Sequence, residues 1–202
     1  MQRTEWILLT ILIVLVALIG AVLIMSGLRL PRSQAQTPQT VALPQALTAR
    51  SAYDMALPLA QQWASDATLV NAQATWDVSP DFHYSEASWG FIFYSNSQSA
   101  TAMVSVTDDR AGLLATRQSA RQLVPADLSG WQIDSPQIVE TVLNTGGQPF
   151  LNRLGDATLV LTLDASNKPV WKGKLFHEES GETLSVEVDP ASGDVLEVEQ
   201  TQ

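Results

Sequence analysis

The sequence contains no cysteine, and this absence excludes several kinds of chemistry at once. Disulfide bonds, thiolate metal sites, iron–sulfur clusters and cysteine nucleophiles all require that residue. The core must therefore be stabilised by the burial of apolar side chains. Histidine is scarce as well, with 2 residues in the chain, so few positions could supply imidazole chemistry.

Basic residues are also few, with 11 lysines and arginines against 21 acidic residues and a formal net charge of −10. Residues 1–47 hold three arginines and one glutamate, so residues 48–202 carry −12. Such a region is repelled by phosphate, and we expect no nucleic-acid partner. The acidic surface serves either solubility or the binding of a basic partner, and the sequence leaves both open.

Charged residues are absent from residues 7–28, where Thr10 and Ser26 are the polar side chains. As a helix this run would span roughly 33 Å, enough to cross a bilayer. The run predicts a single-pass transmembrane helix, with residues 1–28 as an N-terminal membrane anchor. A cleaved signal peptide is the alternative, because residues 33–35 loosely fit a cleavage site, but apolar signal cores are usually ~7–15 residues long.

The same run carries three small residues, Gly20, Ser26 and Gly27, which would allow close packing against another membrane helix. It begins near the N-terminus, as signal-anchors do, and we therefore expect the C-terminal domain to be extracytoplasmic. The arginines around the run slightly favour the opposite orientation, but long soluble domains translocate largely regardless of such biases.

Residues 29–48 are rich in proline, glutamine and threonine and predict an extended linker. The rest of the chain divides into two similar units, 49–127 and 128–202. The five residues at 66–70 recur at 156–160, and further matches, among them Trp89 with Trp171, share an offset of 82. We interpret the pattern as a duplication.

Each unit begins with apolar residues at helical spacing and continues with alternating strands. In the first unit, Pro58 should kink the helix or delay its start to about residues 55–58. In the second, Asp134 to Pro136 predicts a helix start and Gly146-Gly147 a helix end. The predicted fold class is α+β: a transmembrane helix followed by two helix-plus-antiparallel-sheet units.

Three short motifs resemble the PepSY family: Asp134 to Pro136 before an apolar helix, Pro169 to Trp171 opening a strand, and residues 186–196 around a turn. The similarity covers roughly residues 131–200 and extends more weakly, by duplication, to 50–118. It implies a cystatin-like fold, a helix packed on an antiparallel sheet. Such domains occur in exported and membrane-anchored bacterial proteins and in protease propeptides, where they bind or inhibit peptidases or act as regulatory modules.

Catalytic chemistry has little support in the sequence. The loop at residues 79–88 brings together Asp81, His83, Tyr84 and Glu86, which could approach a divalent cation but more simply form a polar surface loop. We expect no catalytic residues, no metal and no cofactor. The paired tryptophans, Trp89 and Trp171, suggest a shared core role, and Trp131 is placed to pack one unit onto the other.

These observations predict a membrane-tethered, non-enzymatic, extracytoplasmic binding or regulatory module. Its sheet edge or acidic face would meet a protein partner, which could be a peptidase. The alternative is a structural accessory subunit of a larger membrane complex, held through residues 7–28.

Overall fold

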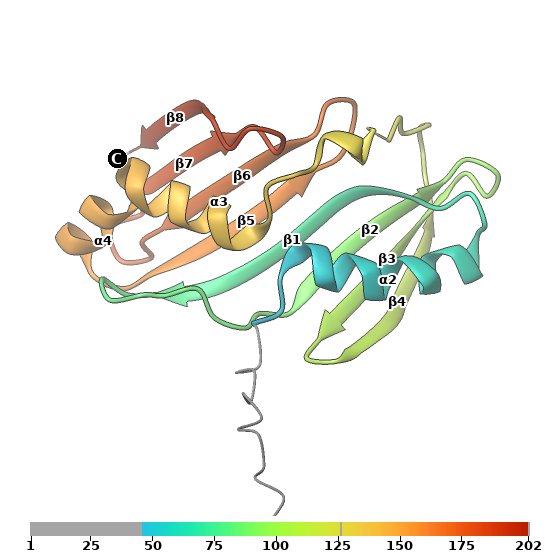
Figure 1. Cartoon of the computed structure of the whole chain (residues 1–202), viewed down its shortest axis with the longest axis horizontal. Helices are drawn as coiled ribbons and strands as arrows, with labels where there is room; N and C mark the ends of the chain where they lie inside the picture. The colour runs from blue at the N-terminus through green and yellow to red at the C-terminus, as the bar shows by residue number, and fades with distance from the viewer. Residues whose placement is uncertain (1–45, 126, 202) are drawn as a thin grey trace, which may run out of the picture. The chain divides into compact units, whose positions relative to one another are not determined.

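The computed structural model describes residues 46–125 and 127–201, and it shows one antiparallel sheet with helices on one of its faces (Figure 1). Helix α2 (Ala49–Trp63) precedes strands β1 (Thr68–Val78), β2 (Trp89–Ser95), β3 (Ala100–Thr107) and β4 (Arg110–Gln118). Helices α3 (Ser135–Val142) and α4 (Gln148–Leu154) precede β5 (Ala157–Asp164), β6 (Val170–Phe176), β7 (Thr183–Val188) and β8 (Val195–Thr201).

The strands of the two halves join through a central pair. The order across the sheet is β4-β3-β2-β1-β5-β6-β7-β8, and each neighbouring pair is antiparallel. Strands β1 and β5 are in continuous register from Asn71 opposite Asp164 to Val78 opposite Ala157. The sheet therefore continues without interruption from one half of the chain to the other.

This topology corrects the predicted fold class. The sequence suggested a transmembrane helix followed by two helix-plus-antiparallel-sheet units packed together, whereas the domain is mostly one continuous eight-stranded antiparallel sheet with few helices. The two halves form one sheet because each half would otherwise have an unpaired edge strand. Strands β1 and β5 would each leave a row of backbone groups unpaired if the halves stood apart, and pairing them satisfies both rows.

The predicted single-pass transmembrane helix also needs correction. Within residues 46–125 and 127–201, no helix is both long and apolar enough to cross a bilayer. The run at residues 7–28 and its packing candidates, Gly20, Ser26 and Gly27, lie outside the residues that the structure describes, as does most of the expected linker.

Alternation along the strands places the core on the helix-covered face. In β5, Leu159, Leu161 and Leu163 are fully buried, while the residues between them are partly exposed. In β3, Val104 and Val106 are fully buried in the same alternating way. Both patterns confirm the strands predicted from period-two hydrophobicity.

Helix α2 begins earlier than Pro58 suggested. Thr48 caps it, because the Thr48 side chain accepts a hydrogen bond from the Ser51 N–H while the Ser51 hydroxyl accepts one from the Thr48 N–H. Pro58 lies inside the helix, on its exposed side. The buried face consists of small residues that allow close approach to the sheet: Ala49, Ala52, Ala56 and Ala60.

Helix α3 starts where the sequence predicted, with Asp134 as its N-cap, and the predicted helix end at the glycine pair is confirmed, because Gly146 has non-helical dihedral angles between two helices. Gly146 adopts φ 155° within a wide turn, and α4 continues the chain from Gln148. Helix α4 ends at Gly155, whose φ of 94° is costly for residues with a side chain.

Aromatic side chains from both halves meet in the core. Trp89 and Trp171 are fully buried, with ring centroids 6.3 Å apart in an edge-on arrangement. Trp131 is buried between Trp171 and helix α2, with ring centroids 6.0 Å from Trp171 and 5.7 Å from Tyr53. These contacts confirm the predicted core role of the paired tryptophans and the bridging role of Trp131.

Each of the paired tryptophans also fixes the start of a helix. The Trp89 indole donates a hydrogen bond to the Leu47 carbonyl oxygen at 3.3 Å, and the Trp171 indole donates to that of Ile133 at 3.2 Å. Both acceptors stand one residue before the N-cap of the helix that follows. The two halves therefore share the same hydrogen bond, from a tryptophan indole to the carbonyl oxygen before a helix N-cap, at equivalent positions.

Candidate functional site

The loop between β1 and β2 holds the four candidates named from the sequence. Asp81, His83 and Glu86 are exposed, whereas Tyr84 turns inward. Its hydroxyl donates to the Leu47 carbonyl oxygen at 2.9 Å, and burial raises the pKa of Tyr84 to about 12. Among the described residues, no group of three or more histidines, aspartates and glutamates is placed to hold a metal ion.

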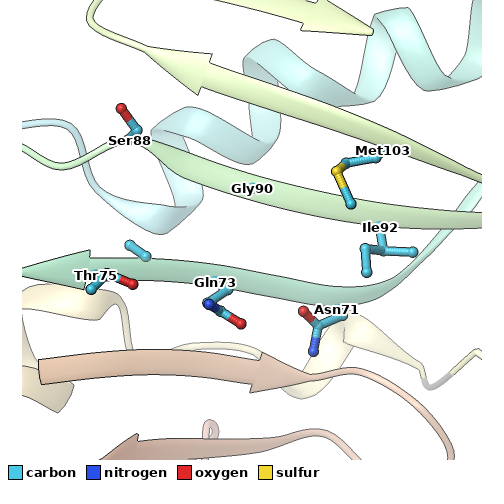
Figure 2. A pocket seen from close by; sticks show the side chains of 8 residues that line it. Asn71, Gln73, Thr75, Ser88, Gly90, Ile92 and Met103 are labelled. Atoms are coloured by element: carbon cyan, nitrogen blue, oxygen red, sulfur yellow. The ribbon is translucent and has the colours of Figure 1, made fainter. Parts of the chain in front are cut away.

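The face of the sheet opposite the helices carries a shallow hollow over the first half (Figure 2). Its volume is about 450 Å³. The side chains around it are uncharged, and they come mainly from the outward positions of β1, β2 and β3: Asn71, Gln73, Thr75, Ser88, Ile92 and Met103. Gly90 contributes no side chain to this surface, and a Cβ built there would have the Gln73 carbonyl oxygen as its nearest neighbour, at 3.9 Å.

Over the second half, the corresponding area of the open face carries charged side chains. Lys172 stands at the position equivalent to Gly90, and its Nζ lies 2.7 Å from Oε1 of Glu187. The hydrogen bond to Glu187 is the main cause of a raised pKa of Lys172, and the charges of Asp164 and Glu197 add to it. The open face is therefore uncharged and hollow over one half but ionic over the other.

The sheet ends in two edge strands, β4 and β8, which are each paired on one side. All residues of β8 are exposed, including Val195, Leu196 and Val198 at 40%, 50% and 46%. Strand β4 carries Leu113 and Leu114 at 45% and 63% exposure. Edge strands with apolar side chains offer backbone groups and contact area to an added strand.

The two edges differ in charge. Strand β8 contains Glu197 and Glu199, and no lysine or arginine within the described ranges forms an ion pair with either. Strand β4 instead contains Arg110 and Arg117. Part of the acidic charge expected from the composition therefore lies on β8, where the carboxylates of Glu197 and Glu199 form no ion pair with a described residue.

Sequence reasoning anticipated a binding edge but could not identify the strand. The final strand alternates glutamate with valine, and this pattern alone is equally typical of a strand with one buried face. Its position at the end of the sheet depends on the β1–β5 pairing, which no local pattern in the sequence encodes.

Comparison with known proteins gives a solved structure with a similar fold and no family. No family model matches the chain, and no curated protein matches it. The fold is similar to the crystal structure of a "putative lipoprotein" from Clostridium difficile 630, with 13% sequence identity and a TM-score of 0.50. The match covers 79% of this chain and 97% of that one, and at this identity it shows a shared fold.

Proposed function

We propose that this chain is a membrane-associated, extracytoplasmic, non-enzymatic module that binds or regulates a partner protein by accepting an extended segment at an edge of its sheet. The observation that carries the proposal is the exposure of every residue of β8 at the end of a continuous sheet. A relationship to the PepSY family, whose members bind or inhibit peptidases, belongs to the same proposal and rests on the motifs in residues 131–200.

The unpaired outer side of β8 is the physical support for strand addition. The outer side of β8 has no neighbouring strand among the described residues, so its outward N–H and C=O groups are free to pair with another chain. Exposed valine and leucine side chains lie beside those groups. A bound strand would therefore gain main-chain hydrogen bonds and apolar contact together.

The support for membrane association comes from the N-terminal sequence and from the similar solved structure, not from the domain at residues 46–201. Residues 7–28 are uncharged and strongly apolar in sequence, and the Clostridium difficile neighbour is described as a lipoprotein. The acidic charge of residues 48–202 would keep the domain off an anionic lipid surface, so the domain would face soluble or membrane-bound protein partners.

Disulfide trapping can test strand addition, because the chain has no cysteine of its own. L196C places a thiol on β8, L114C places one on β4, and S192C places one in the exposed turn before β8 as a control. The full-length variants would be incubated with the peptide Thr-Val-Thr-Cys-Thr-Val-Thr and with Thr-Pro-Thr-Cys-Thr-Pro-Thr, whose prolines prevent strand pairing.

The proposal predicts faster trapping of the valine peptide than of the proline peptide at an edge cysteine, with no such preference at S192C. Equal trapping of the two peptides at all three positions would contradict binding by strand addition.

A further inference from the structure

We infer that β8 is a docking strand for an extended, cationic segment of a partner protein, in which basic residues alternate with apolar ones. The inference rests on the proposed function and adds the chemistry of the partner. The direction of the β8 side chains, their charge and the contrast with β4 support it.

The register of β8 sorts its side chains onto two faces. Glu197 lies opposite Glu187 and Glu199 opposite Ser185, so both carboxylates point to the open face of the sheet. Val198 lies opposite the buried Val186 and points to the helix-covered face. An added strand would therefore meet acidic groups on one face and an apolar surface on the other.

The apolar side of β8 is left uncovered by the helices. Val198 is 46% exposed although its neighbour Val186 is fully buried. An added strand with apolar side chains on this face would extend the core by one strand and remove the exposed valine from water. The same strand would direct its alternate residues toward Glu197 and Glu199.

On the open face of the sheet, the charge of β8 determines which residues of an added strand would bind well. Glu187, opposite Glu197, is already paired with Lys172, and neither Glu197 nor Glu199 forms an ion pair with a described residue. Lys172 is close enough for the charge of Glu197 to raise its pKa, but it leaves both carboxylates of β8 available to a partner. Lysine or arginine opposite these carboxylates would form cross-strand ion pairs, whereas acidic residues would be repelled. The arginines of β4 give that edge the opposite preference.

Peptide binding to the full-length chain in an uncharged detergent tests the inference. The probe is the fluorescently labelled peptide Lys-Val-Lys-Val-Lys-Val-Lys with blocked ends, and the comparison peptides carry threonine or glutamate in place of lysine. Binding would be followed by fluorescence anisotropy at low and at high salt, because exposed ion pairs weaken with ionic strength.

The protein variants are a matched pair. E197K/E199K reverses the charge of β8, and D81K/E86K makes the same change in net charge on an exposed loop next to β1. Strand β8 lies four strands from β1, roughly 19 Å away, which is beyond the screening length of ~10 Å at moderate salt. The control therefore separates a local effect of β8 from the overall charge of the domain.

The inference predicts that the lysine peptide binds about tenfold more tightly than the threonine peptide, and that E197K/E199K removes this preference while D81K/E86K retains it. High salt should reduce the same preference. Equal weakening by both variants would overturn the inference, because it would show attraction to the whole acidic domain. Equal binding of the lysine and threonine peptides would also overturn it but leave strand addition intact, whereas no binding of any peptide would contradict both.

Discussion

Gly173 lies on the core face of β6, directly beneath Val142 of α3. A Cβ built on Gly173 would stand 2.3 Å from Cγ2 of Val142, a buried β-branched side chain with little freedom to move. We expect G173A to reduce the free energy of unfolding by about 1–3 kcal/mol, as overpacking of a core does. Urea unfolding followed by circular dichroism measures the change.

The control for this change is G90A. A Cβ at Gly90 would meet nothing closer than 3.9 Å, so the substitution should leave stability unchanged or slightly raised. Similar losses in G173A and G90A would mean that the close approach of α3 to β6 is not what requires glycine.

Asp66 provides a prediction about pH. Its carboxylate accepts hydrogen bonds from the Ser95 hydroxyl at 2.6 Å and from the Ser97 N–H at 2.8 Å, and these bonds lower the pKa of Asp66 from 3.8 to about 2. Because the folded-state pKa is the lower one, the carboxylate stabilises the fold above pH 3.8, and this contribution disappears as the pH falls toward about 2.

D66N should therefore be less stable than the wild-type protein at neutral pH, and the difference should shrink between pH 3.8 and about 2. Denaturant midpoints measured across this range would show it. The control is D156N, at the exposed equivalent position of the second half. A stability difference for D66N that does not change with pH would rule out the ionised carboxylate as its source.

Individual core residues could be predicted from the sequence where both halves repeat them, as Trp89 and Trp171 do. Tyr84 could not, because its neighbours Asp81, His83 and Glu86 suggest a polar loop. The inward position of Tyr84 depends on Leu47, a residue from a distant part of the chain that its hydroxyl contacts.

The starts of α2 and α3 depend on each other. The Ala49 N–H, in the first turn of α2, donates to Ser135 Oγ at 2.9 Å, and both residues are fully buried. S135A would leave this amide without its acceptor, and we expect a loss of about 1–3 kcal/mol in the free energy of unfolding. Chemical denaturation would give the value.

Thr141 supplies the comparison for S135A, because its hydroxyl bonds to the Gln137 carbonyl oxygen of the same helix and lies near the surface. T141A should cost about 0.5 kcal/mol or less. If S135A costs no more than T141A, the contact between the two helix starts does not contribute to stability.

Strands were easier to predict than helices in this chain. Period-two burial made β3 and β5 recognisable, and the glycine pair marked the break between α3 and α4, whereas Pro58 was a misleading signal for the start of α2. Burial of the alanine face stabilises α2, although Pro58 has no N–H to donate a helical hydrogen bond. Gly146 ends the first helical stretch, because its φ of 155° is non-helical and redirects the chain into α4.

At the scale of the whole domain, the two halves share the β1–β5 pair and one aromatic cluster. Unfolding one half would expose the tryptophans of the other, so we expect a single cooperative transition for residues 46–201. Tryptophan fluorescence and far-ultraviolet circular dichroism should give coincident urea curves. Two separated transitions would indicate halves that fold independently.

The repeated pattern of the two halves was visible in the sequence, but the joining of their strands into one sheet was not. Local patterns predict strands and turns, while the pairing of β1 with β5 is a choice among edges that are chemically similar. The free edge, and with it the proposed binding site, follows from that pairing.

Amide hydrogen exchange of the full-length chain, with and without Lys-Val-Lys-Val-Lys-Val-Lys, tests the central claim most directly. Strand addition at the acidic edge predicts that the backbone amides of β8 exchange more slowly when the peptide is bound, with the loop at residues 79–88 unchanged. Protection confined to that loop, to the helices or to β4, with β8 unaffected, would contradict the account.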